Sequence, residues 1–162
     1  MKKLFSILIV AVLLITTACA AGNKLVSTSS TTPETKGFLP MKLNIQIDNG
    51  TSKHTLTATL YDNSSSRALV ELLQKAPVTI DMHDYGNFEK VGDLPVTLPR
   101  NDTPTDTDAG DIILYLGKSF VIYYDKNSWN FTPLGKVDGV TKTELKKILG
   151  KGNVIAVLSV EL

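Results

Sequence analysis

A succession of short, β-patterned segments separated by turn residues is the feature that most constrains the fold of this chain. Met41–Asp48 alternates apolar and polar residues, the pattern of a half-buried strand. Asn49 and Gly50 then mark a tight turn before the β-branched segment Lys53–Tyr61, so the pair predicts a hairpin. The chain has one cysteine, which excludes an intramolecular disulfide. Its core must therefore form by packing alone.

Two other segments have helical spacing. In Asn63–Ala76, a stripe of alanine and leucine follows Asn63 and three serines, any of which could cap a helix. In Val140–Gly150, Thr141 and Glu144 have the spacing of a capping box, and a glycine at 150 or 152 would end the helix.

Further β-patterned segments lie between and after these helices. The Gly- and Pro-rich segment 86–104 predicts loops with short strands. The order of strands, helix, many strands, helix and strand predicts a mainly β fold, either a closed barrel or a sandwich with helices at its ends. The additional predicted strands are Pro77–Tyr85, Asp111–Leu116, Lys118–Tyr124 with a turn at Gly117 before it, and Asn153–Leu162.

The first 19 residues have the layout of a bacterial export signal. Lys2 and Lys3 precede an apolar segment, Leu4–Ile15, which is followed by small residues. That segment is shorter than the roughly 20 residues a membrane-spanning helix needs. We therefore predict an exported protein without a mature transmembrane helix.

Cys19 allows two outcomes of processing. Small residues before a cysteine resemble a lipobox, although Thr16 stands where leucine is usual, and they predict lipidation of Cys19 and a membrane-anchored protein. The alternative is cleavage after Ala20, which would release a secreted or periplasmic protein. We favour the lipoprotein.

The segment after the signal is rich in serine and threonine. Residues 20–37 have no hydrophobic periodicity and predict a flexible tether, which leaves 38–162 as one domain with a single core. Without Lys2 and Lys3 the net charge falls from +1 to −1, and the chain contains two arginines. This composition does not favour nucleic-acid binding.

Five short motifs, in order along the chain, resemble the bacterial cyclophilin-like domain family. The resemblance covers essentially all of Met41–Leu162 and implies a closed eight-stranded β-barrel with two short helices at its ends. Members of this family generally lack the catalytic residues of true cyclophilins, and no cofactor is implied. The motifs are Tyr85–Gly92, Leu98–Arg100, Gly110–Tyr115, Asn127–Asn130 and Leu134–Val137.

The chain departs from the catalytic pattern of true cyclophilins, which isomerise Xaa-Pro bonds. Those enzymes place an arginine beside the proline in a Phe-His-Arg motif, and the nearest match here is Met82-His83-Asp84. An acid at the third position would repel a carbonyl oxygen. Arg100 lies in a long loop and could reach a pocket, or it could pair with Asp102 or Asp106.

Other chemistries lack their residue patterns. His54 and His83 have neither cysteine neighbours nor helical spacing, so we predict no metal site. The acidic run from Asp102 to Asp111 only partly matches a calcium-binding loop, because Gly117 stands where glutamate is needed. We interpret the run as a solvated loop with capping aspartates. The chain also lacks a G-x-S-x-G motif and a Gly-rich phosphate cradle.

Several rings and charges remain as candidate binding residues. Tyr115, Tyr123 and Phe131 are predicted to lie in the core, whereas Trp129, placed in a turn between strands, is predicted to be partly exposed. Glu89, Lys90 and Lys136 could orient a ligand, but an ion pair that holds loops to the barrel is the favoured interpretation.

We therefore expect a non-catalytic domain that binds a peptide or small ligand in a groove at the barrel rim. The Tyr85–Leu94 loop, the Pro99–Gly110 loop and Trp129 would bound this groove. The alternatives are a weak prolyl isomerase for exported proteins and an accessory module for a flavodoxin-like redox partner. The candidate ligand-binding residues are Tyr85, Phe88, Glu89, Lys90, Arg100 and Trp129.

Overall fold

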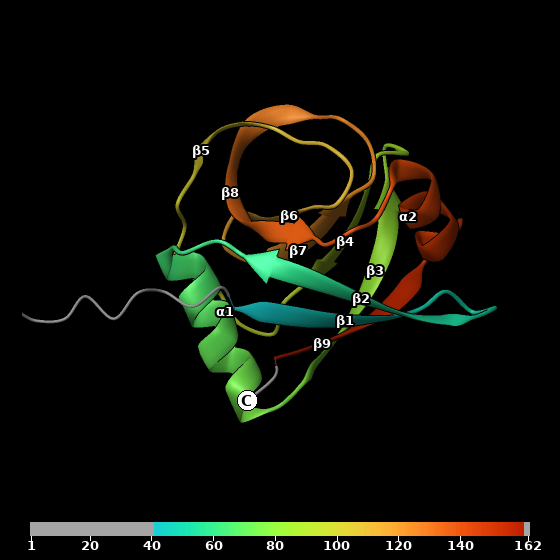
Figure 1. The fold of residues 1–162 in the computed structure, drawn as a ribbon. Helices are drawn as coiled ribbons and strands as arrows, with labels where there is room; N and C mark the ends of the chain where they lie inside the picture. The colour runs from blue at the N-terminus through green and yellow to red at the C-terminus, as the bar shows by residue number, and fades with distance from the viewer. Residues whose placement is uncertain (1–40, 161–162) are drawn as a thin grey trace, which may run out of the picture. The chain divides into compact units, whose positions relative to one another are not determined.

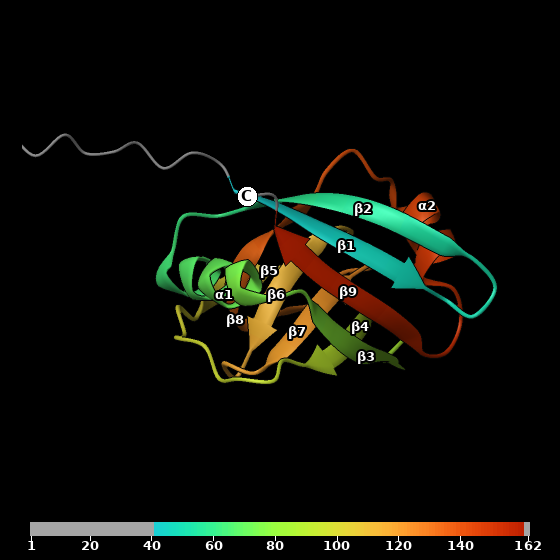
Figure 2. The same cartoon turned by 90° about the horizontal axis from the view of Figure 1, so that it is seen from below.

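The computed structural model describes residues 41–160, which form nine strands and two helices (Figures 1 and 2). The signal sequence, Cys19 and the tether lie outside the described residues. In chain order the elements are β1 (Lys42–Asp48), β2 (Lys53–Leu60), α1 (Ser64–Lys75), β3 (Val78–Tyr85), β4 (Glu89–Asp93), β5 (Thr103–Asp106), β6 (Asp111–Tyr115), β7 (Ser119–Tyr123), β8 (Ser128–Val137), α2 (Lys142–Leu149) and β9 (Val154–Val160).

Eight of the strands close into an antiparallel barrel. The neighbours run β2-β1-β9-β3-β4-β7-β6-β8, and β8 pairs with β2 to complete the ring. β5 pairs only with the first half of β8 and lies outside the ring. This confirms the eight-stranded barrel that the family resemblance implied.

Alternation along the strands builds the core inside the barrel. Leu43, Ile45 and Ile47 on β1 are all buried, as their period-two spacing predicted. The tip of the predicted β1–β2 hairpin is held by Asn49, whose side-chain oxygen accepts hydrogen bonds from the amides of Thr51 and Ser52. Its side-chain nitrogen donates to the Ile148 carbonyl near the end of α2.

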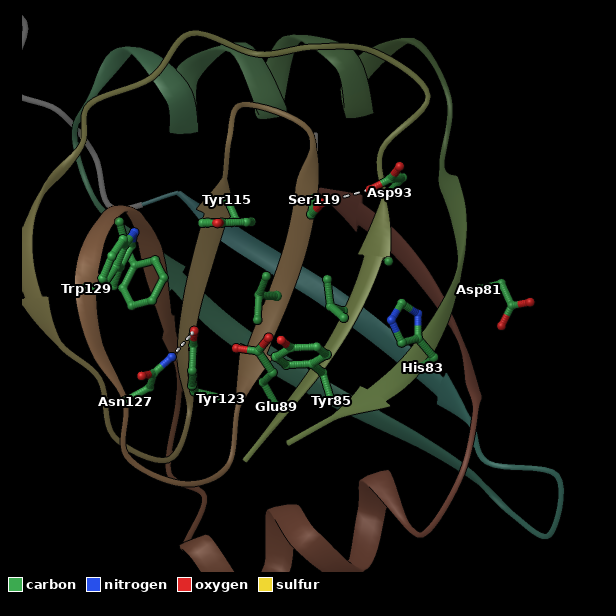
Figure 3. Close-up of a pocket in the computed structure, with 14 residues that line it drawn as sticks. Asp81, His83, Tyr85, Glu89, Asp93, Tyr115, Ser119, Tyr123, Asn127 and Trp129 are labelled. Atoms are coloured by element: carbon green, nitrogen blue, oxygen red, sulfur yellow. Dashed lines mark hydrogen bonds between the residues drawn. The ribbon is translucent and has the colours of Figure 1, made fainter. Parts of the chain in front are cut away.

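Helices close the two ends of the barrel, as the close-up in Figure 3 shows, with α1 above the strands and α2 below them. α1 begins after Asn63, whose side chain accepts a hydrogen bond from the Ser66 amide. The buried hydroxyl groups of Ser65 and Ser66 donate to the carbonyls of Pro99 and Leu134, and these bonds attach the helix to the barrel.

α2 has the capping box that the sequence predicted. The Thr141 side chain accepts from the Glu144 amide, and Glu144 in turn accepts from the Thr141 amide. Gly150 ends the helix, and Leu145 and Leu149 face the core. Of residues 41–160, no helix is long and apolar enough to cross a membrane.

Two hairpins have three-residue loops, each containing a β-turn in which both central residues have positive φ, as a type I′ turn requires. The central residues of these turns are Gly86–Asn87 between β3 and β4, and Leu116–Gly117 between β6 and β7. The second is the turn predicted at Gly117.

Three strands differ from the sequence-based expectations. Glu89–Asp93, within the expected Tyr85–Leu94 loop, forms β4. Trp129 lies within β8 and not in a turn, and β5 forms part of what was expected to be a loop. Both segments become strands because they pair with each other, Thr105 opposite Trp129. Gly37–Leu162 is one compact unit that contains every element and core residue described here, so we expect this fragment to fold when it is produced by itself.

Candidate functional site

A groove of about 680 Å³ lies on the outer wall of the barrel, over β3, β4, β7 and β6 (Figure 3). The first half of β8 forms its far side. Its position on the wall differs from the expected groove at the barrel rim. The lining residues are Asp81, His83, Tyr85, Glu89, Val91, Gly92, Asp93, Tyr115, Ser119, Val121, Tyr123, Asn127, Trp129 and Phe131.

Strand register sets this lining in rows across the sheet. Glu89 is paired with Tyr85 on one side and with Tyr123 on the other. In the next row, Val91 is paired with His83 and Val121. Residues two apart on a strand share a face, so both rows point outward.

An aromatic band forms the floor of the groove. Phe88 contacts Tyr85 edge-on and stacks in parallel with Tyr123, with ring centroids 6.0 and 6.2 Å apart. Phe131 then contacts Tyr123 and Tyr115, at 5.7 and 6.2 Å. Tyr123 and Phe131 belong to a second, smaller hydrophobic cluster outside the barrel, together with Ile113 and Val121. The barrel wall is therefore apolar on both faces here.

Glu89 is the most buried charged residue of the groove, with 8% of its surface exposed. Burial raises the pKa of its carboxyl group, and a hydrogen bond from Tyr123 and the charge of His83 offset part of that rise. The Asn127 side chain donates to the Tyr123 hydroxyl at 3.3 Å. Burial, together with Glu89, raises the pKa of Tyr123. Tyr123 is therefore neutral and donates its hydroxyl hydrogen to the Glu89 carboxyl group.

Lys90, the next residue, faces the inside of the barrel and is fully buried. Its ammonium group donates to the Gly152 carbonyl at 2.5 Å and lies 3.4 Å from the Asp84 carboxylate, which also accepts from Tyr124. Lys90 therefore cannot reach a ligand in the groove. The sequence analysis favoured a structural ion pair for Lys90, and Lys90 does form one. Its partner is Asp84 on β3.

The remaining candidate charges have partners of their own. Arg100 binds Asp102, one of the two partners expected if it is not functional, and it does not line the groove. Lys136 pairs with Asp111 at 2.6 Å. Asp106 accepts a hydrogen bond from Ser128. Within residues 41–160, no group of three or more His, Cys, Asp or Glu residues could hold a metal ion.

Of the six candidate ligand-binding residues, the structure brings Tyr85, Glu89 and Trp129 together in the groove. Phe88 contacts the rings of Tyr85 and Tyr123 but does not line the groove, and Lys90 and Arg100 lie elsewhere. Trp129 is 65% exposed, as expected for a partly exposed ring.

Two interpretations from the sequence are corrected. Tyr115, expected in the core, is 37% exposed in the groove, because Ile112 and Leu114 take the inward positions of β6. In the Met82-His83-Asp84 segment the groove-facing residue is His83, and Asp84 points inward toward Lys90. A ligand in this groove would therefore face His83 and not Asp84.

The sequence analysis did not identify several residues that line the groove, among them Asp81, Asp93, Ser119 and Asn127. One signal was available. Phe120–Tyr123 is a continuous apolar run, and a strand that is apolar on both faces must be covered on both. In a barrel whose helices cover only its ends, such a strand indicates that further apolar side chains cover the outer face of the barrel.

Comparison with known proteins agrees with this architecture. The model of the Cyclophilin-like family matches residues 45–159, which is most of the chain. The chain belongs to the cyclophilin-like family. Among solved structures it is similar to a hypothetical protein from Archaeoglobus fulgidus, determined in solution, with a TM-score of 0.55 and 17% sequence identity. The match covers 76% of this chain and 97% of that one, and at this identity it supports the fold alone. No curated protein matches the chain.

Proposed function

We propose that this cyclophilin-like domain binds a peptide segment or small molecule in the groove on its outer wall. The observation that carries the proposal is a cavity of about 680 Å³ with a largely aromatic lining and a few convergent polar groups. Ligand sites in proteins typically have this size and this mixture of residues. The exposed ring of Trp129 and the half-buried ring of Tyr115 offer surface for apolar contact.

The arrangement favours binding over prolyl isomerisation. An isomerase needs a cationic donor at the twisting amide, and no lysine or arginine lines the groove within the described residues. Arg100, the one candidate for that role, is engaged by Asp102. Isomerisation by this chain remains the alternative outcome of the experiment below.

The N-terminal sequence supports an exported, lipid-anchored form of the protein. In this proposal Cys19 carries the lipid and residues 20–37 tether the binding domain to the membrane. A Cys19→Ser precursor should then lose its membrane attachment, measured by fractionating cells and following the protein. Unchanged attachment would overturn the lipoprotein proposal and leave the binding proposal intact.

Binding is tested by recording amide NMR spectra of Gly37–Leu162 during titration with a mixed panel of ligands. The panel contains an Ala-Pro peptide and small neutral, anionic and cationic molecules. Shifts confined to groove residues such as Tyr85, Val121 and Trp129, with Leu43 and Leu158 unaffected as buried core controls, would support the proposal. If no ligand shifts the groove, the proposal fails. Accelerated cis–trans exchange of the Ala-Pro peptide would instead support isomerase activity.

A further inference from the structure

The groove has a marked charge asymmetry. Three carboxylates line it, from Asp81, Glu89 and Asp93, and of the described residues no lysine or arginine does so. His83 is its one basic side chain. Asp93 is balanced at the edge by Lys118, 3.5 Å away, and it accepts a hydrogen bond from Ser119. Glu89, in the middle of the groove, has no lysine or arginine of the lining beside it, and the charge of His83 offsets only part of the effect of its burial.

Glu89 is flanked by the rings of two tyrosines. Strand pairing places it between Tyr85 and Tyr123, and Figure 3 shows its carboxylate beside both rings. The neighbouring lysine, Lys90, is on the opposite face of β4 and pairs with Asp84. A carboxylate that is 8% exposed and has no lysine or arginine beside it is costly to keep ionised.

Two aromatic rings of the groove have exposed surface. Tyr85 is 60% exposed and Trp129 is 65% exposed, and they approach the groove from different strands, β3 and β8. The one cation–π contact found within the described residues involves Lys146 and Tyr124, which lie outside the groove. Ring faces attract cations through their quadrupole, and most strongly where water is partly excluded.

We propose that the groove selects an organic cation, an alkylammonium group that lies against the aromatic rings with Glu89 as its counter-charge. This inference rests on the proposed binding function and specifies the ligand class of the same groove. A cation beside Glu89 would compensate the burial that now disfavours its charged form. The ammonium group can belong to a free amine or to a lysine side chain in a peptide, and the test separates these two sources.

The first test compares choline with 3,3-dimethyl-1-butanol, which has the same shape without the charge. Both are titrated into Gly37–Leu162 and followed by NMR at the amides of Tyr85, Glu89 and Tyr123 and at the Trp129 indole. We expect choline to bind at least about tenfold more tightly than the alcohol. Equal or weaker binding of choline would overturn the cation proposal.

Variants then assign the preference to the proposed residues. Glu89→Gln should abolish the preference for choline, whereas Glu71→Gln, a matched change on the exposed face of α1, should leave it intact. Trp129→Ala should weaken choline binding about threefold or more, and because this ring is exposed the substitution leaves the core unchanged. If Glu89→Gln retains the full preference, Glu89 is not the counter-charge and the proposal fails.

A second pair of probes distinguishes the source of the cation. A capped Ala-Lys-Ala tripeptide and its norleucine analogue differ in the ammonium group. Tighter binding of the lysine peptide than of choline would support a peptide ligand, and the reverse would support a free amine. If neutral or anionic ligands shift the groove and neither cation does, the cation proposal fails while the binding function stands. If nothing shifts the groove, the binding function itself fails.

Discussion

At the scale of single residues, Glu89 and Lys90 have opposite environments although they are neighbours in the chain. A strand sends successive side chains to opposite faces, so Glu89 points to the outer groove and Lys90 to the barrel interior. Lys90 there has an acidic partner and a backbone carbonyl. Glu89 has a hydrogen bond from a tyrosine hydroxyl and the charge of His83, but no lysine or arginine of the groove lining beside it. Of the two, Glu89 is the residue whose charge the fold compensates only in part.

This asymmetry predicts the pH dependence of stability. Because the folded pKa of Glu89 is raised above its ordinary value of 4.5, the folded state holds this proton more tightly than the unfolded state does. The resulting stabilisation is fully present below the unfolded pKa and is lost as the pH rises through the folded pKa. Glu89→Gln should therefore gain stability relative to the wild type as the pH rises, measured by urea unfolding from about pH 4 to about pH 8.

Glu71→Gln is the control for the removal of one negative charge, because Glu71 is exposed on α1. Its unfolding midpoint should follow that of the wild type across the same range. A Glu89→Gln protein that loses stability relative to the wild type toward neutral pH would show that the Glu89 carboxylate is compensated in the fold. In that case the burial argument for a missing cation would also fail.

At the scale of elements, β1 and β2 could be predicted because one of their faces is buried and the other is largely polar. The helices could be predicted from their caps, since Thr141 and Glu144 have a spacing that strands do not use. β5 could not. Its sequence, Thr103–Asp106, is polar and contains Pro104, and it becomes a strand only by pairing with β8. Such pairing is a tertiary contact that local patterns do not encode.

The groove was predictable only in part, for a related reason. Trp129 is surrounded by turn-forming residues in Asn127–Asn130, so the sequence indicates a turn there. In the structure this segment begins β8, the strand that places Trp129 at the groove. In β6 and β7 the apolar residues follow one another without polar residues between them. The sequence therefore does not show which side chains face the barrel interior, and Tyr115 could not be assigned to a face. Tyr85 and Glu89 were found because they belong to a recognisable motif. Their neighbours in the groove come from other strands, and those neighbours can be identified only once the pairing register of the strands is known.

At the scale of the whole molecule, the barrel depends on its closure between β2 and β8. Only three residue pairs make this contact, Ala58–Val137, Thr59–Lys136 and Leu60–Gly135. Gly135 allows the close approach, because a Cβ atom there would lie 2.4 Å from the Thr59 carbonyl oxygen and 2.9 Å from the Leu60 Cα. Both are backbone atoms, so a side-chain rotation cannot relieve the overlap.

Gly135→Ala should therefore loosen the closure and destabilise the domain by about 1–3 kcal/mol or more, measured by urea unfolding. Hydrogen exchange should rise first at the amides of β2 that face β8, because local opening there no longer requires the whole barrel to unfold.

Gly139→Ala is the control variant for this prediction. Its Cβ would meet nothing within 4 Å, and its positive φ alone should cost about 1 kcal/mol without a local rise in β2 exchange. Equal stability and exchange in the two variants would mean that the β2–β8 contact does not limit the opening of the barrel. The groove is lined by β3, β4, β7, β6 and the first half of β8, whereas the β2–β8 pairs use residues 135–137 in the second half of β8, so Gly135→Ala should leave the groove residues in their native environment wherever the domain remains folded.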